Sequence, residues 1–238
     1  MTTLLFRDDA YLRSCTGTVT ALTDEGGIVL DQTVFYPTSG GQPGDSGTLS
    51  WTGGGLDVAT AVKGQGDEVV LLPAEPAALP PVGQTVTQTI NWDRRHRLMR
   101  VHTALHLLSV VIPLPVSGGS IAADKGRLDF DMPEAPQDKT QLQDDLNRLI
   151  ACNMDVTDEW ITDAELDAAP DLVKTMSVQP PRGSGKIRLV RIGVGSETAD
   201  LQPCGGTHVS NTSEIGTVRI GKIEKKGRQN RRVYLHLE

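Results

Sequence analysis

The sequence has few of the residues that cross-link a secreted chain. Only three cysteines occur among 238 residues, at Cys15, Cys152 and Cys204. An odd, low count argues against a disulfide framework and indicates a protein of the reducing cytoplasm. Cys15 and Cys152 have no histidine or cysteine at ligand spacing, so we expect both to be small buried hydrophobic residues.

Long apolar runs are also missing. The first residues, MTTLLFRDDAYLRSC, place Arg7, Asp8 and Asp9 where a signal peptide needs an unbroken apolar stretch. The most apolar segment, LHLLSVVIPLPV, is short and contains Pro113 and Pro115. We therefore expect neither a signal peptide nor a membrane span, and a cytoplasmic location.

The positive charge is low overall but concentrated in two places. A net charge of −7 would ordinarily count against a nucleic-acid partner. However, residues 94–100, the first basic segment, hold four arginines and no acid. Residues 219–232, the second basic segment, hold seven basic residues against Glu224 alone. Such segments can contact phosphates locally on an acidic protein, although both could equally be solvated faces of a helix and a hairpin.

The first 90 residues are expected to be all-β. Short β-rich runs begin at Gly17, Gly27, Gly47 and Glu68, and glycine, aspartate and proline separate them. This pattern predicts a small barrel or sandwich, followed by a proline-rich linker or rigid edge at residues 71–84.

Residues 91–238 are expected to form an α+β domain, which makes the whole chain α+β. A helix should begin at an N-cap Asp93 and end before Pro113. After it we expect a Gly-Ser turn, a strand, a polar helix, a loop-rich acidic segment and a strand-rich end that closes with a hairpin. The turn is expected at residues 117–120, the strand at 127–131 and the polar helix at 137–152. The acidic segment covers residues 153–173 and the strand-rich end covers 186–237, with the hairpin turn at 226–230.

Four side chains predict a metal site. In HTALH, His102 and His106 are spaced i, i+4 and share one helix face. In CGGTH, Cys204 and His208 flank two glycines. Three imidazoles and one thiolate are the ligands that a zinc ion prefers, whether the site is closed and structural or keeps an open position. Thr103 stands where an H-E-x-x-H protease has its general-base glutamate, which excludes that mechanism.

A glycine-rich loop, FYPTSGGQPGDSG, forms a third feature. It is a β-turn by composition, but Gly40 and Gly41 also allow close approach of a ligand to the backbone beside Gln42. Gln42 could therefore position a water molecule or hold a substrate carbonyl.

The chain resembles the AlaX-type free-standing alanyl-tRNA editing proteins, relatives of the editing region of alanyl-tRNA synthetase. The joint pattern of H-x-x-x-H, C-G-G-T-H and G-G-Q is specific, and the GGTH loop favours the alanyl over the threonyl branch. The resemblance extends from about residue 30 to residue 238 and rests on FYPTSGGQPGDSG, RRHRLMRVHTALHLLS, GGSIAADKGRLDFD, IRLVRIG, LQPCGGTHVSNTSEIG and KIEKKGRQNRR.

This resemblance implies hydrolysis of the ester that joins serine or glycine to the terminal ribose of tRNA(Ala). It implies one zinc ion on His102, His106, Cys204 and His208, an N-terminal β-barrel-like domain at residues 1–90 that carries the GGQ loop, and a zinc-binding editing domain at residues 91–238. Gln42 and Thr103 are then candidate catalytic or specificity residues, because a site that hydrogen-bonds the serine hydroxyl spares alanine. Candidate substrate contacts are Gly40, Gly41, Gly119 and Ser120. Candidate tRNA contacts are Arg94, Arg95, Lys225, Lys226, Arg228, Arg231 and Arg232.

Two other functions stay open. One is a tRNA-binding module with a structural zinc ion and no activity. The other is a metallohydrolase of small esters or amides, in which the basic segments play no part. The sequence is compatible with a monomer or a homodimer.

Overall fold

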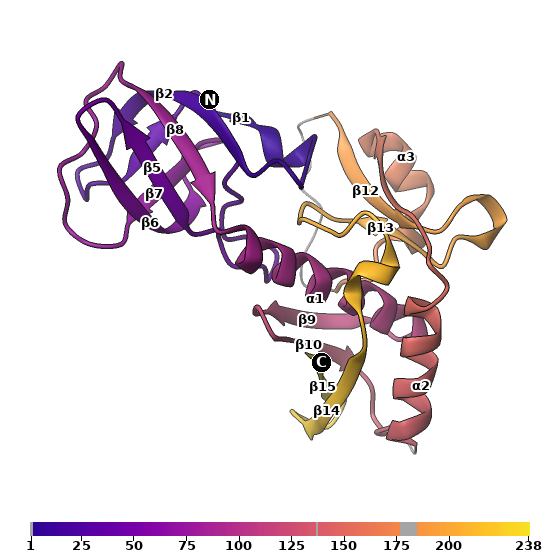
Figure 1. Cartoon of the computed structure of the whole chain (residues 1–238). Helices are drawn as coiled ribbons and strands as arrows, with labels where there is room; N and C mark the ends of the chain where they lie inside the picture. The colour runs from indigo at the N-terminus through magenta and orange to yellow at the C-terminus, as the bar shows by residue number, and fades with distance from the viewer. Residues whose placement is uncertain (1, 137, 177–184) are drawn as a thin grey trace. The chain divides into compact units, whose positions relative to one another are not determined.

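The computed structural model describes residues 2–136, 138–176 and 185–238. The chain divides into two compact units, Met1–Arg97 and Leu98–Glu238. The α+β class predicted from the sequence is confirmed, since a closed barrel is followed by helices and antiparallel sheets (Figure 1). The assignment of residues 1–90 and 91–238 as separate domains stays a prediction.

The first unit is built around a closed barrel of antiparallel strands, as the β-rich pattern predicted. Around the barrel the order is β2-β3-β7-β6-β5-β8, and pairing of β2 with β8 closes the ring. Closure removes unpaired edges. The strands are β2 (Ser14–Leu22), β3 (Ile28–Leu30), β5 (Gly47–Trp51), β6 (Gly54–Lys63), β7 (Val69–Pro73) and β8 (Thr85–Ile90); a short parallel pair consists of β1 (Thr3–Leu4) and β4 (Gln32–Thr33).

The proline-rich segment does not end the β region, contrary to the prediction. Residues 74–84 connect β7 to β8, and β8 then pairs with both β2 and β5. In β8, Val86, Gln88 and Ile90 face inward while the threonines between them are exposed, which is the alternation of a half-buried strand.

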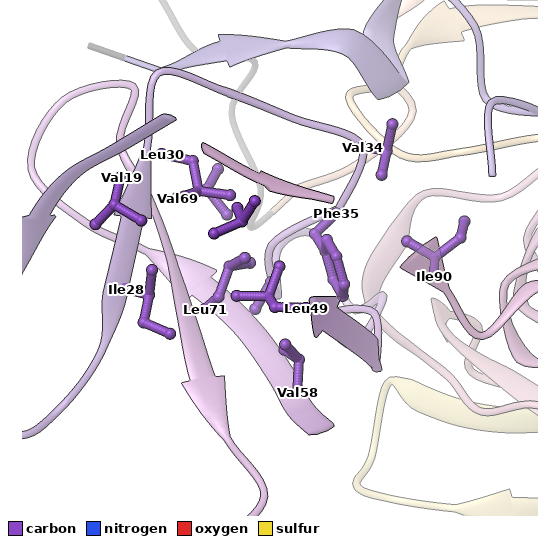
Figure 2. Packing of buried hydrophobic residues seen from close by; sticks show 12 residues of the cluster. Val19, Ile28, Leu30, Val34, Phe35, Leu49, Val58, Val69, Leu71 and Ile90 are labelled. Atoms are coloured by element: carbon purple, nitrogen blue, oxygen red, sulfur yellow. The ribbon is translucent and has the colours of Figure 1, made fainter. Parts of the chain in front are cut away.

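The barrel interior is filled by branched aliphatic side chains, one alanine and one phenylalanine. Figure 2 shows this cluster, in which every strand of the barrel contributes at least one side chain. Close packing of this kind stabilises the barrel in proportion to the apolar area that it buries. Its buried members are Val19, Ile28, Leu30, Val34, Phe35, Leu49, Val58, Ala61, Val69, Leu71, Val86 and Ile90.

The helix α1 (Trp92–Val111) begins in the first unit and continues in the second. Its N-cap is Asn91 and not the predicted Asp93, because the Asn91 Oδ1 accepts the Arg94 N–H at 3.1 Å. Asp93 lies in the first turn, where its negative charge interacts favourably with the positive end of the helix dipole.

The second unit contains a four-stranded antiparallel sheet in the order β14-β15-β10-β9. Its strands are β9 (Val116–Ile121), β10 (Lys125–Asp131), β14 (Val218–Lys225) and β15 (Asn230–Leu237). α1 packs directly on β10, where a Cβ on Gly126 would lie 2.7 Å from Val101 and 2.8 Å from Leu105. The prediction of a turn at residues 117–120 is wrong, because these residues belong to β9 and pair with β10, with Ser120 opposite Arg127. The closing hairpin is confirmed by the bond from the Lys226 N–H to the Asn230 carbonyl.

The helix α2 (Lys139–Ile150) covers the edge strand β14. Asn147 accepts the Val218 N–H at 2.9 Å and donates to the Val218 carbonyl at 2.9 Å, and Gln143 accepts the Ile220 N–H at 3.0 Å. These amide side chains take the place of a further strand.

The segment predicted to be loop-rich, residues 153–173, contains regular structure. It forms β11 (Val156–Ile161) and α3 (Asp163–Ala168), and β11 joins a second antiparallel sheet in the order β11-β12-β13. The other strands of this sheet are β12 (Ile187–Ile192) and β13 (Asp200–Pro203). No helix in the described part of the chain is both long enough and apolar enough to cross a membrane.

Candidate metal centre

The two helical histidines lie together on α1. His102 and His106 are buried, and their ring centroids are 5.2 Å apart. One helical turn separates the two residues, so the helix geometry alone brings the two rings to one face. His96, which was left out of the predicted site, stacks instead on Trp92 in the first unit.

The loop that carries Cys204 and His208 is held by a buried arginine. Arg188 in β12 donates from Nη1 to the carbonyls of Cys204 and Gly206, each at 2.9 Å. The Cys204 N–H donates back to the Arg188 carbonyl at 3.1 Å. Asp158 in β11 binds the Nη2 of the same guanidinium. These bonds hold the CGGTH loop to β12, and through Asp158 to β11.

The ligand atoms of the four predicted residues converge. One atom from each of His102, His106, Cys204 and His208 lies within 4.8 Å of all the others. The Cys204 Sγ is 3.5 Å from the His102 Nε2 and 3.3 Å from the His208 Nε2. In a tetrahedral zinc site with ordinary bond lengths, sulfur and nitrogen ligands lie about 3.5 Å apart. The spacing and the donor set thus fit a zinc ion.

The charge state of the cluster also suits a cation. Burial opposes ionisation of the Cys204 thiol, but His102 and His208 hold the pKa of Cys204 well below its usual range. Burial likewise opposes a charged His106, yet the bond to Asp200 and the nearby Cys204 raise the pKa of His106 to about 9. Burial and His102 together push the pKa of His208 well below its usual range. A metal ion bound here requires a thiolate and neutral imidazoles, so the cluster would release protons when it binds the ion.

Thr103 lies beside the cluster rather than in it. Its Oγ1 is 3.1 Å from the His208 Nδ1 and accepts the Val209 N–H at 3.3 Å. With a metal ion bound at the His208 Nε2, Nδ1 would carry the ring hydrogen and donate it to Thr103. Thr103 therefore orients a candidate ligand, and its predicted contact with substrate stays a prediction.

The GGQ loop belongs to the first unit and forms a tight turn. Ser39 and Gln42 exchange both backbone hydrogen bonds, and Gly40 and Gly41 have φ of 56° and 84°. A two-residue turn with positive φ at both positions strongly favours glycine, so these glycines have a backbone role. Gln42 is 0% exposed. Substrate contacts by this loop stay predictions.

Two predicted tRNA contacts on α1 hold this same loop. Arg95 is 0% exposed and pairs with the buried Asp45, and Arg94 donates to the Gly44 carbonyl at 2.7 Å. The prediction for Arg95 needs correction, because a phosphate cannot reach a guanidinium with no exposed surface.

The second basic segment divides into exposed and engaged residues. Lys225, Lys226 and Arg228 are exposed on the hairpin, although the Lys226 Nζ also pairs with Glu224 at 2.9 Å. Arg231 is buried and donates to the carbonyls of Gly227, Asn230 and Pro133, which corrects the prediction of a phosphate contact there. The Arg232 guanidinium binds both oxygens of Asp129 at 2.7 and 2.8 Å.

The remaining predicted residues have mixed outcomes. Gly119 is exposed and Ser120 is half-buried on β9, and their predicted substrate contacts stay predictions. Cys15 is half-buried against the barrel core. Cys152 is exposed, so the prediction that it is a buried hydrophobic residue is wrong. Arg188 and Asp200 were not predicted, since no local spacing in the sequence marks either as part of the site.

Known protein families match segments in both parts of the chain. Residues 187–234 match the family model of the threonyl and alanyl tRNA synthetase second additional domain, and residues 13–94 match that of class II (A) tRNA synthetases. The alanyl-tRNA editing protein AlaX-M of Methanosarcina acetivorans is 34% identical over 100% of this chain and 99% of its own length. AlaX-M of Saccharolobus solfataricus is 32% identical over 98% of each chain. Alanine–tRNA ligase of Pyrobaculum arsenaticum is 33% identical over 93% of this chain but only 25% of the ligase.

Proposed function

The chain belongs to the AlaX-M family of alanyl-tRNA editing proteins, and on that premise we propose that it is a deacylase acting in trans on mischarged tRNA(Ala). It hydrolyses the ester between the terminal ribose and a wrong amino acid, serine or glycine. The observation that carries the proposal is the convergence of the four ligand atoms in a chain that matches these relatives over its whole length.

Zinc is the metal that the donor set supports. His102, His106, Cys204 and His208 would hold it, and the two sulfur–nitrogen distances suit a tetrahedral ion. A zinc ion bound there supplies a fixed positive charge that ties α1 to the CGGTH loop. The protein's own groups then bind the substrate, orient it and hold the protons around it.

Thr103 is suited to recognising the serine hydroxyl. With the His208 Nδ1–H and the Val209 N–H donating to its Oγ1, Thr103 keeps its own hydroxyl hydrogen to donate to substrate. The side chain is 0% exposed, so the residues around it have to move before a substrate reaches that hydrogen. Alanine offers no partner for that hydrogen and leaves a buried polar group unsatisfied. This supports cleavage of seryl-tRNA with alanyl-tRNA spared.

Gln42 is 0% exposed, so the residues that cover it have to move when the substrate binds. It is the proposed group that positions a water molecule or the ester carbonyl. An uncharged amide can do both without a change of protonation state. The bulk of the catalytic effect then comes from fixed geometry. Gly40, Gly41, Gly119 and Ser120 are kept as proposed substrate contacts.

The tRNA backbone is proposed to bind at the exposed hairpin residues Lys225, Lys226 and Arg228, with weaker contributions from Arg94 and Arg232. Phosphate contacts position a nucleic acid without reading its sequence. Replacing Lys225 and Arg228 with alanine should weaken tRNA binding and make its salt dependence shallower. An unchanged salt dependence would remove the hairpin from the proposal.

A deacylation assay tests the function directly. The zinc-loaded protein is incubated with Ser-tRNA(Ala), Gly-tRNA(Ala) and Ala-tRNA(Ala), and the remaining ester is followed over time. We expect the first or second to be cleaved and the third to be spared. C204A should abolish cleavage, while C152A, which changes an exposed cysteine outside the cluster, should match the wild type.

The same assay separates the other two functions. A tRNA-binding module would bind all three tRNAs and cleave none, which overturns the proposal. A small-ester hydrolase would cleave a model ester such as seryl methyl ester equally well with or without the hairpin substitutions, and would not prefer charged tRNA.

A further inference from the structure

A buried carboxylate next to the metal cluster has no part in the function proposed above. Asp200 is the first residue of β13 and is 2% exposed. Its Oδ2 lies 2.9 Å from the His106 Nδ1 and 2.8 Å from the Gln202 Nε2, and its Oδ1 lies 2.5 Å from the Lys174 Nζ. Burying a carboxylate is costly unless it is paired and hydrogen-bonded, so these partners explain how the chain tolerates it.

The bond to His106 decides which ring nitrogen faces the cluster. An ionised carboxylate only accepts hydrogen bonds, so the His106 Nδ1 must carry its hydrogen toward Asp200. The Nε2 of the same ring then presents its lone pair to the other ligand atoms, all within 4.8 Å of one another. Gln202 Nε2 also lies 3.2 Å from the His106 Nδ1, and its hydrogen goes to Asp200 because a protonated Nδ1 cannot accept it.

We propose that Asp200 is a positioning residue for the metal centre, which fixes the tautomer and ring orientation of His106, and that Lys174 and Gln202 hold Asp200 in place. This inference rests on the proposed metal site. It names no new ligand for the metal, since Asp200 acts through His106.

Lys174 binds the carboxylate oxygen of Asp200 that does not face His106. Its ammonium group pairs with Asp200 Oδ1, and its carbonyl accepts the Val116 N–H of β9 at 3.0 Å. The positive charge balances the buried carboxylate at neutral pH. The chain thus ties the metal ligand on α1 to β9 through three consecutive contacts within the second unit.

Two of the histidine ligands, His208 and His106, have different hydrogen-bond partners. His208 donates to the neutral hydroxyl of Thr103, whereas His106 donates to an anion. Charge-assisted hydrogen bonds are about twice as strong as neutral ones. Carboxylate partners of this kind also make the imidazole a better electron donor, and their loss typically weakens metal binding about 10–100-fold.

The test measures zinc affinity, which does not depend on deacylase activity. The full-length protein, its D200N variant and its K174M variant are stripped of metal and titrated with zinc against a chromophoric chelator. D200N should bind zinc about 10–100-fold more weakly. K174M should show a smaller loss, since the carboxylate remains. D129N is the control, because it changes a carboxylate that binds Arg127 and Arg232 instead, and its zinc affinity should equal that of the wild type.

Cobalt provides a second readout. Tetrahedral cobalt bound to a thiolate absorbs in the visible and near ultraviolet, and D200N should alter the intensity or position of these bands when saturated. Circular dichroism of the metal-free proteins checks that each variant is folded.

The inference is overturned if folded D200N binds zinc within twofold of the wild type. If D200N does not fold, K174M decides: wild-type zinc affinity in K174M also overturns it. A wild-type protein that binds zinc but cleaves no charged tRNA would end the proposed function and leave this inference standing, so the two failures are distinguishable.

Discussion

Replacing Arg95 should destabilise the first unit severely and should not act through tRNA. The Arg95 guanidinium donates to both oxygens of Asp45, to the Val34 carbonyl at 2.6 Å and to the Ala10 carbonyl at 2.8 Å. Both members of the ion pair are almost completely buried. In R95M the Asp45 carboxylate would stay buried and lose the guanidinium. Of the hydrogen bonds described here, it would keep the one from the Tyr36 N–H.

The magnitude follows from that geometry. Removing one partner of a buried ion pair costs about 3–5 kcal/mol, because the other charge is left without compensation. Native proteins are stable by only about 5–15 kcal/mol, so this loss is a large fraction of the total. With a urea dependence of about 2 kcal/mol per M, the midpoint of unfolding should fall by about 1.5–2.5 M.

Urea unfolding followed by tryptophan fluorescence measures the effect, since Trp51 and Trp92 both belong to the first unit. R97M changes an exposed arginine of the same helix and should shift stability by less than about 1 kcal/mol. The double variant R95M/D45N should lose less than the sum of the single losses, because both changes remove one interaction. An R95M protein as stable as the wild type, with a shallower salt dependence of tRNA binding, would refute the reasoning and restore Arg95 as a phosphate contact.

Three further outcomes are expected. G44A should destabilise the first unit by about 1–3 kcal/mol or more, because a Cβ on Gly44 would lie 2.0 Å from the Ala61 carbonyl oxygen. G118A should be tolerated, because the atom nearest to its Cβ would lie 3.7 Å away. Thermal unfolding of both variants tests this difference. L71A should cost about 2–5 kcal/mol in urea, because Leu71 is completely buried in the barrel, and a loss below about 1 kcal/mol would contradict that packing. Burial opposes ionisation of Asp129, but Arg232 and Arg127 hold its pKa below its usual range. Its contribution to stability is therefore present above about pH 4 and is lost as the pH falls. The stability difference between wild type and D129N should be constant above about pH 5 and should shrink as the pH falls below about 4.

The metal cluster could be predicted because its information is local and its residues are rare. Helical spacing fixes His102 and His106 on one face, and a cysteine and a histidine around two glycines have little reason to occur otherwise. The ligand preference of zinc then links two segments that lie about a hundred residues apart. No knowledge of the fold was needed for that step.

Residues whose roles depend on distant partners were not predictable in this way. Arg95 belongs to a run of arginines, and only the fold brings it to Asp45, fifty residues earlier. Asp200 is one of 30 acidic residues, with no motif to distinguish it. Both are buried charges, and burial is a property of the tertiary structure.

The strands show a similar limit. β6 starts with two glycines and contains aspartate and lysine, all of which are depleted in strands, so its pairing with β5 and β7 decides its structure. β8 does alternate regularly and could have been recognised, but the prolines before it suggested that the β region had already ended.

The two amide side chains of α2 also bear on how copies of this chain can meet. Asn147 and Gln143 occupy the backbone groups of Val218 and Ile220 that a strand from another molecule would need. Edge-to-edge association through this stretch of β14 would first have to displace α2. The helix therefore prevents further strands from adding to the sheet at this stretch. Strand pairing between two copies of this protein would therefore have to use another edge.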